Sequence, residues 1–478
     1  MLSVIPEAGI PQAVFPGDVR RNFKLLSIES VSSRNLEAHS YDQSTFPASI
    51  SGASAHHGGQ HCGTWSAACG HDWCSSHHGR FEASLMQDLI KPLSREIVAS
   101  EPFGGTRSRI PQDLRKHPRV AIIGVSGYAS MLLDSVIPAL KVARGSLVAA
   151  TAIGADRESS TAKALSNAGC AIFPDYKQML STFRNRIDLC IIPTSIHWHA
   201  RMSVDAMLAG AHVLVEKPLA GSVADALKVT EASSRTGRFA AVGFQDMYST
   251  TTHEIKRFLC SNRLGRVRSL VASGSWPREK PYYDRNDWAG KSFKEGWAVQ
   301  DSPLNNAFAH FLNLALYFSA TEAGEFARIG NYGGNLLRCY PIETFDTAKV
   351  KLQTTEGVQI ECAFTHSDED LVAPTLTISL DHGYLTWDFE NVAHATQKDG
   401  AEVARWKLDT SDEARMAMMT NILQCLDSGD EPMCPARTAL IHTQVVERIM
   451  SSLPIENFHS ESPSWRLRKG LFSSLLQA

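Results

Sequence analysis

The chain has 478 residues, of which 43% are hydrophobic and 20% charged, and its formal net charge at pH 7 is −3. This length exceeds a single comfortable core, so two or three domains are expected. The small net charge gives no electrostatic reason to expect nucleic acid or an anionic membrane as partner, and no stretch approaches the ~20 apolar residues of a membrane span. We therefore expect a small-molecule ligand, no nucleic acid and no membrane.

The N-terminal stretch, residues 1–117, is rich in Ser, His, Gly and Pro and has poor apolar periodicity. This composition predicts a tail without a core of its own, either disordered or the result of a start codon assigned too early. Residues 56–78 hold six histidines and three cysteines, and such side chains can bind zinc. Their spacing matches no zinc module with paired ligands, so we expect no specific metal site. The other seven cysteines are scattered singly, which is typical of reduced, packed thiols and predicts a cytoplasmic location.

From Arg119 onward, short apolar runs alternate with segments of helical spacing. The runs cover residues 120–124, 147–153, 187–192, 213–215 and 239–242. Ser222 is a suitable N-cap for one helix, and Gly210 and Gly237 are suitable stops. Strands alternating with helices predict βαβ units and a doubly wound parallel sheet over residues 118–243.

After residue 243 the pattern changes to paired strand-like runs, 348–353 with 358–364 and 375–380 with 384–389. Gly357 and Gly383 lie in the two intervening turns, where we expect each to supply a positive φ. Helical spacing follows at 413–426 and 436–451. These patterns predict a second domain over residues 244–455, with an antiparallel sheet and helices, followed by a C-terminal extension over 456–478.

A candidate nucleotide site lies where the first strand meets the first helix. A dinucleotide fingerprint has the form G-x-G-x-x-G there, because small residues let the backbone approach the pyrophosphate at the helix N-terminus. This chain has Gly124, Ser126, Gly127, Tyr128 and Ala129 in that turn, with Ser and Ala at two glycine positions. Both side chains are small enough to keep the approach, and the seryl hydroxyl can donate to a phosphate.

The second strand leads into Asp156 and Arg157. A carboxylate there can accept the ribose hydroxyls of NAD, whereas the neighbouring arginine could pair with the 2′-phosphate of NADP. Asp156 thus indicates NAD and Arg157 indicates NADP, and NAD is slightly favoured.

Taken together in chain order, these features resemble the Gfo/Idh/MocA family, which includes glucose-fructose oxidoreductase and inositol dehydrogenase. The resemblance covers about residues 118–455 and rests on the fingerprint turn, Ala-Asp-Arg at 155–157, Ile-Ile-Pro-Thr-Ser-Ile-His-Trp-His at 191–199, Ala-Gly-Ala-His-Val-Leu-Val-Glu-Lys-Pro-Leu at 209–219, and His310. It implies a Rossmann domain that binds NAD or NADP, a second domain with an open, mainly antiparallel sheet, and hydride transfer at a carbohydrate or polyol carbon. It also implies a homo-oligomer formed through the C-terminal sheet.

By the same resemblance, Lys217 is the catalytic lysine that hydrogen-bonds the reacting oxygen. Pro193, Thr194 and His197 line the nicotinamide side, and Glu216 orients the cofactor. Alcohol oxidation removes a hydride from carbon and a proton from oxygen, so a cation and a base must meet at that oxygen.

His310 matches the second catalytic position of the family, which usually has an Asp four residues earlier. Here that residue is Asn306, and the acid that follows His310 in the family pattern is likewise Asn313. Asn306 can hydrogen-bond a substrate but cannot accept a proton, so His310 is the only evident general base. Local sequence alone favours a core histidine on an apolar helix, whereas the resemblance favours the catalytic position for His310.

The segment 275–290, followed by Trp297, is the best candidate for substrate contact. Aromatic faces stack on sugar rings, while Arg and Asn side chains bind hydroxyls or a carboxylate. The candidate residues are Trp276, Arg278, Tyr283, Arg285, Asn286 and Trp288. An ordinary surface loop or a subunit interface would explain the same composition.

The sequence thus predicts an NAD(P)-dependent oxidoreductase acting on a sugar, a polyol or a related cyclic alcohol. One alternative is a lyase or glycosidase that oxidises its substrate transiently with a tightly held NAD. The other is a non-catalytic nucleotide-binding scaffold or sensor, which the missing acid at Asn306 would suit.

Overall fold

The computed structural model describes residues 117–458 and 462–477. Residues 1–116, which contain nearly all of the expected tail and its His- and Cys-rich stretch, lie outside the described residues, and nothing tests those expectations. In the described part of the chain, no helix combines the length and apolarity needed to cross a membrane.

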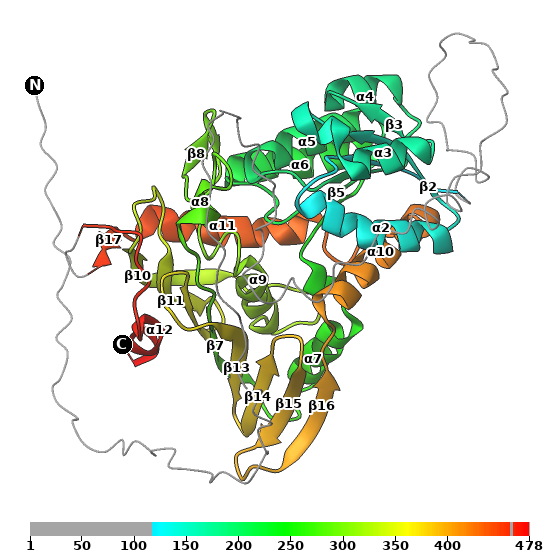
Figure 1. The fold of residues 1–478 in the computed structure, drawn as a ribbon. Helices are drawn as coiled ribbons and strands as arrows, with labels where there is room; N and C mark the ends of the chain where they lie inside the picture. Colours follow the sequence, from blue (N-terminus) through cyan, green and yellow to red (C-terminus); the bar gives the residue numbers. More distant parts are fainter. Residues whose placement is uncertain (1–116, 459–461, 478) are drawn as a thin grey trace, which may run out of the picture. The chain divides into compact units, whose positions relative to one another are not determined.

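The first half of the described chain forms a six-stranded parallel sheet with strand order β3-β2-β1-β4-β5-β6. Its strands are β1 (Arg119–Ile123), β2 (Ser146–Thr151), β3 (Ala171–Phe173), β4 (Leu189–Ile192), β5 (His212–Val215) and β6 (Ala240–Val242). Its helices are α2 (Tyr128–Val142), η2 (Gly154–Glu158), α3 (Ser160–Asn167), α4 (Tyr176–Thr182), α5 (Ile196–Leu208) and α6 (Val223–Thr236). This is the Rossmann arrangement, with the order reversing between β1 and β4. Figure 1 shows it in colours from cyan to green.

Local sequence explains the ends of these elements. The Ser222 hydroxyl accepts a hydrogen bond from the Asp225 amide and caps α6, which ends at Gly237 in the left-handed conformation (φ 66°). Five of the six strands lie on the predicted apolar runs. The third strand, Ala171–Phe173, was not predicted, because three half-buried residues give no readable period.

The second half forms a nine-stranded sheet with order β16-β15-β14-β13-β7-β12-β11-β10-β17. The strands are β7 (Val267–Ser275), β10 (Ile329–Arg338), β11 (Thr347–Thr354), β12 (Gln359–Thr365), β13 (Val372–Leu380), β14 (Gly383–Asp388), β15 (Val392–Gln397), β16 (Glu402–Lys407) and β17 (Ile455–Asn457). The pairs β7–β12 and β10–β17 are parallel and the remaining pairs are antiparallel. The expected mainly antiparallel sheet is therefore confirmed. A separate hairpin, β8 (Phe293–Lys294) with β9 (Trp297–Ala298), lies in the segment expected to contact substrate.

The two predicted hairpins are present, but their glycines act differently. Gly357 has a φ of 90°, as expected for its turn. Gly383 has no positive φ, so that expectation was wrong. A Cβ on Gly383 would instead lie 2.0 Å from the carbonyl oxygen of Thr396, so this glycine allows two strands to approach closely.

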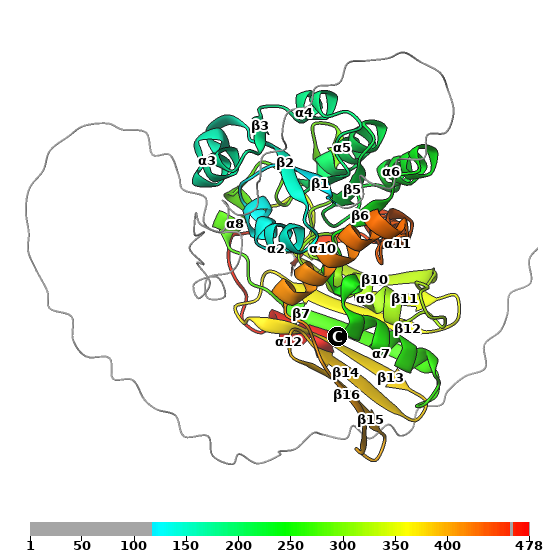
Figure 2. The ribbon, with the colours of Figure 1, turned by 90° about the vertical axis from the view of Figure 1, so that its right-hand side faces the viewer.

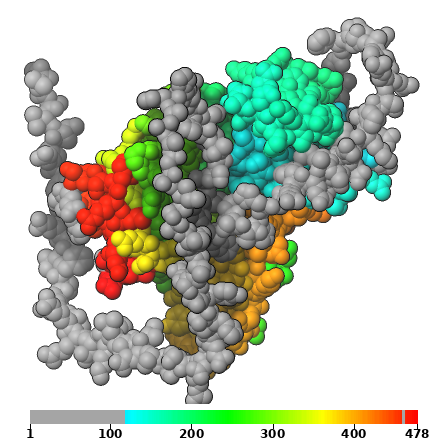
Figure 3. Space-filling model, viewed as in Figure 1, coloured from blue at the N-terminus to red at the C-terminus, as the bar shows by residue number. Residues whose placement is uncertain are grey.

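The remaining helices are η3 (Gln245–Tyr248), α7 (Thr250–Cys260), α8 (Lys280–Asp284), α9 (Ala309–Phe318), α10 (Ser411–Ser428), α11 (Ala436–Ser452) and α12 (Leu471–Gln477). Helix α9 is almost entirely buried. Helices α10 and α11 return to the first sheet and pack against α2 and α6, as Figure 2 shows. At the C-terminal end, β17 pairs with β10 of the second sheet and α12 packs against β12. Figure 3 shows the C-terminal residues as red atoms beside yellow ones.

Candidate active site

The positive ends of two helices are available at the point where the strand order of the first sheet reverses. Helices α3, α4 and α6 each have a side chain that caps the N-terminus. Helices α2 and α5, which follow β1 and β4, have none. Unpaired N–H groups at helix N-termini favour anions, and ligands of such sheets bind at this reversal point. The structure therefore offers a dinucleotide site at the carboxyl ends of β1 and β4.

The turn between β1 and α2 has the backbone that such a site requires. Gly124 and Gly127 have φ values of 103° and 58°, and no atom lies within 4 Å of a Cβ built on Gly127. The Ser126 hydroxyl donates to Asp156 Oδ2 at 2.5 Å, which joins the turn to the end of the second strand. Arg157, next in the chain, is exposed and makes no ion pair among the described residues. The predicted residues of this turn, including the buried Ala129, thus come together.

The carboxyl end of β5 presents Glu216 and Lys217, and the Lys217–Pro218 peptide bond is cis. Glu216 is 7% exposed; its Oε2 accepts from the Lys217 amide at 3.1 Å, while Oε1 has no hydrogen-bond partner. A Cβ on Gly243 would lie 2.6 Å from Oε1, so only glycine leaves room for this carboxylate. Burial raises the pKa of Glu216, whereas Lys217 and then His310 lower it. Both predicted catalytic side chains thus lie near Glu216.

Tyr128, predicted from the sequence to bind cofactor, lies against the same carboxylate. Burial and the neighbouring Glu216 raise the pKa of its phenol, and Arg415 of α10 opposes them. The Tyr128 side chain therefore contributes to the packing of Glu216, while its backbone forms the first turn of α2.

The Lys217 ammonium points at Asn306. Its Nζ donates to the Asn306 backbone oxygen at 2.9 Å and to the side-chain Oδ1 at 3.1 Å. The Asn306 Nδ2 donates in turn to Asp301 Oδ1 at 2.8 Å. Burial lowers the pKa of Lys217, whereas Glu216 and Asp301 raise it. The structure therefore brings together Lys217 and Asn306, and adds a buried carboxylate that the sequence did not reveal.

His310 lies in the first turn of α9 and has an acidic neighbour. Its Nδ1 lies 3.0 Å from Asp246 Oδ2 in η3, outside the angular range of a regular hydrogen bond, and both side chains are more than four-fifths buried. The ring also contacts Phe244 edge-on. The Asp246 carboxylate thus faces Nδ1, and Nε2 is left for another partner.

Pro193 and Thr194 lie in the loop after β4, and His197 lies in the first turn of α5, at the other side of the strand-order reversal. His197 is 5% exposed and its Nδ1 has no hydrogen-bond partner, and burial followed by Arg201 lowers its pKa. His199 connects this loop to the end of β5, because its ring nitrogens lie 3.0 Å from the Thr194 oxygen and 2.7 Å from the Pro218 oxygen. Within the described part of the chain, no three His, Cys, Asp or Glu side chains gather as a metal site would require.

The predicted substrate segment splits into packed and accessible side chains. Trp276 stacks on Phe308 with ring centroids 4.7 Å apart, and Tyr283 is buried against Tyr340 and Trp465. Arg278 is half-buried, and its Nε has no hydrogen-bond partner. A small pocket adjoins these residues, lined by Tyr282, Tyr283, Asp301, Ser302, Pro303, Phe345 and His366.

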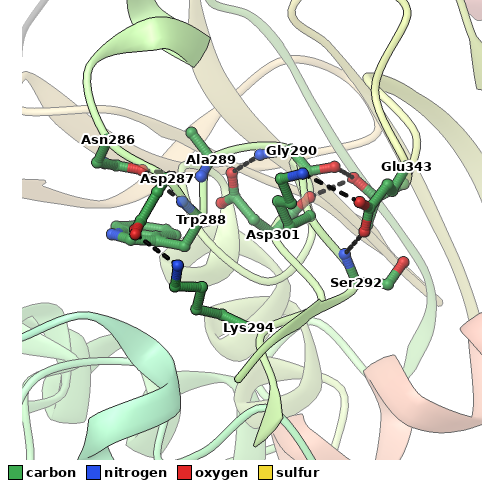
Figure 4. A network of polar contacts seen from close by, with 11 residues as sticks. Asn286, Asp287, Trp288, Ala289, Gly290, Ser292, Lys294, Asp301 and Glu343 are labelled. Carbon is green, nitrogen blue, oxygen red and sulfur yellow. Dashed lines mark hydrogen bonds and ion pairs between the residues drawn. The ribbon is translucent and has the colours of Figure 1, made fainter. Parts of the chain in front are cut away.

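The other members of the segment form the loop of Figure 4. The Asn286 side chain accepts from the amides of Trp288 and Ala289 at 3.1 and 2.8 Å, so it fixes the loop backbone. The Arg285 guanidinium lies 3.4 Å from the ring centroid of Tyr282 and 5.5 Å from that of Trp288. Neither Arg285 nor Arg278 forms an ion pair with a described residue.

Sequence reasoning missed Asp246 and Asp301. Asp246 comes four residues after the end of β6, so its place at the carboxyl end of a strand was a usable signal. Asp301 stands five residues before Asn306 in a loop, and nothing in the local sequence shows that their side chains meet.

Residues 118–244 match a family model described as "Oxidoreductase family, NAD-binding Rossmann fold". Among curated proteins, the chain is 31% identical over 160 residues to a dTDP-3,4-didehydro-2,6-dideoxy-alpha-D-glucose 3-reductase of Streptomyces violaceoruber. It is 30% identical over 185 residues to inositol 2-dehydrogenase 3 of Saccharopolyspora erythraea. These matches cover 33% and 38% of this chain, and 45% and 50% of the relatives. The chain therefore spans about half the length of these relatives, and over residues 118–244 it is similar to the Gfo/Idh/MocA oxidoreductases.

Solved structures resemble more of the chain. The WlbA dehydrogenase of Chromobacterium violaceum, in complex with NADH and UDP-GlcNAcA, has a TM-score of 0.58 at 18% identity, covering 70% of this chain and 94% of its own. A 3-ketoreductase of Actinomadura kijaniata, in complex with NADP and TDP-benzene, has a TM-score of 0.58 at 19% identity, covering 72% of this chain and 99% of its own. At these identities the likeness shows that the fold is shared, over a part of the chain that includes the second sheet.

The described residues fit a nicotinamide dinucleotide, the cofactor class of this Rossmann family. The glycines of the β1–α2 turn and the uncapped N-termini of α2 and α5 suit a pyrophosphate. Two of the buried polar atoms without partners, Glu216 Oε1 and His197 Nδ1, lie just after β5 and β4, where the resemblance places the nicotinamide.

Proposed function

We propose that this protein is an NAD(P)-dependent oxidoreductase that interconverts a CH–OH group and a carbonyl in a sugar, a polyol or a related cyclic alcohol. The observation that carries the proposal is the meeting of a buried ammonium, Lys217, and an imidazole with its own carboxylate, His310 with Asp246, around Glu216 at the end of β5. A cation and a base near one point is what alcohol oxidation needs.

The bound nicotinamide would accept or supply the hydride at the substrate carbon. Lys217 donates a hydrogen bond to the substrate oxygen and stabilises the negative charge that develops there. His310 takes the hydroxyl proton on Nε2 during oxidation, and Asp246 stabilises the resulting imidazolium through Nδ1. Asn306 holds the Lys217 ammonium by two acceptors and takes no proton itself.

For the substrate, Arg278 and Arg285 are the residues we propose to bind hydroxyls or an acidic group, because their guanidiniums have no acidic partner among the described residues. Trp288 offers a half-buried aromatic face near Arg285. Trp276, Tyr283 and Asn286 support this surface through packing and backbone contacts rather than by presenting free polar groups. Asp156 favours NAD as the cofactor, and Arg157 leaves NADP open.

We also propose that residues 118–243 form the cofactor-binding domain and that residues 244–455 form the domain for substrate binding and oligomerisation. The homo-oligomer would form through the second sheet. One face of the second sheet carries Val271 and Tyr384, which are 37% and 45% exposed, with Thr377 paired opposite Val271. Light scattering would then give a multiple of the monomer mass for wild type, and Val271→Glu would lower it. The seven free cysteines of the described chain fit the cytoplasmic location that the sequence predicts.

The test is nucleotide titration followed by turnover. We expect the purified protein to bind NADH or NADPH and to oxidise a member of a panel of sugars, sugar acids and inositols. Lys217→Met should abolish turnover while leaving nucleotide affinity within about threefold, since the side chain acts on the substrate oxygen. Failure to bind either nucleotide, or full turnover by Lys217→Met, would refute the proposal. Analysis of products against cofactor consumed distinguishes net oxidation from transient oxidation followed by elimination or hydrolysis.

A further inference from the structure

Asp301 is a buried carboxylate whose place in the site calls for an explanation. It is 4% exposed, and its two oxygens accept hydrogen bonds from different neighbours: Oδ1 from Asn306 Nδ2 at 2.8 Å and Oδ2 from the Gly290 amide at 2.6 Å. Figure 4 shows the Gly290 bond in the loop network. No described cation lies within ion-pair distance of it. Burying a charge without a partner is costly, so a compensating charge is expected nearby.

Two cations supply that charge without forming an ion pair with Asp301: the Arg285 guanidinium, and the Lys217 ammonium on the far side of Asn306. The Asn306 amide donates to Asp301 through Nδ2 and accepts from Lys217 through Oδ1, so its dipole is aligned from carboxylate to ammonium. This alignment fixes which way the amide faces, because the reverse would set its NH2 against the ammonium. Burial lowers the pKa of Lys217, whereas Glu216 and then Asp301 raise it, and Arg285 lowers it further. Burial raises the pKa of Asp301, whereas the Gly290 amide, Arg285, the Asn306 amide and Lys217 lower it, in that order.

We propose that Asp301 is a positioning residue that acts on Lys217 through Asn306, providing the negative charge for which the Gfo/Idh/MocA pattern uses an acid at position 306. Asp301 takes no proton from the substrate, a role left to His310. It keeps Lys217 charged and keeps the amide oxygen aimed at it. The inference rests on the proposed role of Lys217.

The main competing explanation is purely structural, because Asp301 also holds the loop. Its backbone oxygen accepts from the Thr344 hydroxyl, and its side chain binds the Gly290 amide. Asp301→Asn keeps the shape and an acceptor for Gly290 while removing the charge, so it separates the two roles. Glu343→Gln is the matched control: Glu343 binds the Ser292 amide and Lys291 in the same loop, has a half-exposed side chain and makes no contact with Asn306.

The decisive readout is the pH dependence of Lys217 acetylation by acetic anhydride, followed by mass spectrometry, because it does not require turnover. We expect Asp301→Asn to move the midpoint of labelling to lower pH by about one unit, and Glu343→Gln to leave it unchanged. We take about 0.3 pH units as the resolution of this assay, against the expected effect of about one unit. The proposal is wrong if the midpoint of Asp301→Asn stays within about 0.3 units of the wild-type midpoint, or if Glu343→Gln moves it equally. If Asp301→Asn does not fold, Asn306→Leu breaks the relay while Asp301 keeps its Gly290 bond, and the same shift is expected; an unchanged midpoint overturns the proposal.

Turnover then tests the consequence. We expect Asp301→Asn to lower kcat about 10- to 100-fold with a displaced pH profile, and the charge-swapped variant Asp301→Asn/Asn306→Asp to recover most of that loss, because the carboxylate then lies directly beside Lys217. Equal activity of the single and double variants would contradict the relay. If wild type binds no nucleotide, the proposed function fails, whereas a labelling shift in Asp301→Asn would still show that the two groups are coupled.

Discussion

Replacing Trp297 should loosen the substrate segment from the cofactor-binding sheet. The Arg201 guanidinium lies between two indole rings, 3.7 Å from the ring centroid of Trp198 and 4.4 Å from that of Trp297, and the Lys228 ammonium lies 5.2 Å from the latter. These contacts join the β8–β9 hairpin to α5 and α6. A partly desolvated cation over an aromatic ring is worth about 1–2 kcal/mol and an exposed one about 0.5–1 kcal/mol. Trp297→Ala should therefore cost the hairpin about 1.5–3 kcal/mol.

Because 1.4 kcal/mol is about a factor of ten, the hairpin should open about 10- to 100-fold more often in Trp297→Ala. Native-state hydrogen exchange measures this at the Val299 amide, which donates to the Ser292 oxygen at 2.9 Å. Substrate KM should rise while NADH affinity stays unchanged. Trp297→Phe is the control, since it keeps a ring over Arg201 and should lose less than half of the effect. Unchanged exchange at Val299 in Trp297→Ala would refute the reasoning.

Three further outcomes follow from other contacts. Burial lowers the pKa of His199 to about 4 in the folded protein, so between pH 6.5 and 4 the unfolded chain binds this proton and the folded protein does not. The free energy of unfolding should therefore fall by about 3 kcal/mol between pH 6.5 and 4. Urea titrations of His199→Gln should lack this part of the pH dependence. Gly243→Ala places a methyl 2.6 Å from Glu216 Oε1, so its free energy of unfolding in urea titrations should fall by about 1–3 kcal/mol, and its affinity for NADH should also fall. Gly330→Ala, whose methyl would have no atom closer than 3.7 Å, should leave the free energy of unfolding nearly unchanged. Asp246→Asn should lower kcat about 10- to 100-fold in steady-state assays and leave nucleotide affinity intact, because it removes the partner of protonated His310; wild-type kcat would exclude this role.

Local sequence patterns predicted most of the fold. Ser222 and Gly237 bound α6 because capping depends on a few adjacent residues, and the apolar runs mark five strands because a parallel sheet buries both faces of each strand. The errors fall where tertiary contacts decide. Gly383 is a turn glycine by sequence, yet its constraint is the Thr396 carbonyl on a neighbouring strand.

The candidate site was predictable where a motif fixes chain direction, and not where separate segments meet. Glu216 and Lys217 were expected at the end of β5 because an apolar run leads directly to them. Asp246 lies 64 residues before His310, and only the packing of η3 against α9 brings the two within 3.0 Å. Sequence spacing gives no measure of such a distance. The sequence alone therefore indicates a site without the acid expected at position 306, although Asp246 and Asp301 place two carboxylates in it.

The departure at position 306 and the buried acid at 301 explain each other. With Asp301 in place, an aspartate at position 306 would set two carboxylates about as close as the present 2.8 Å contact, and one of them would have to hold a proton at neutral pH. An amide meets both neighbours without that cost, since it donates to Asp301 and accepts from Lys217. With Asn306 kept, a glycine or alanine at position 301 would leave Lys217 without a negative charge on this side. Asn306 is therefore compatible with a charged, correctly aimed Lys217 because Asp301 accompanies it. We expect a variant that changes only Asp301 or only Asn306 to be less active than the wild-type pair.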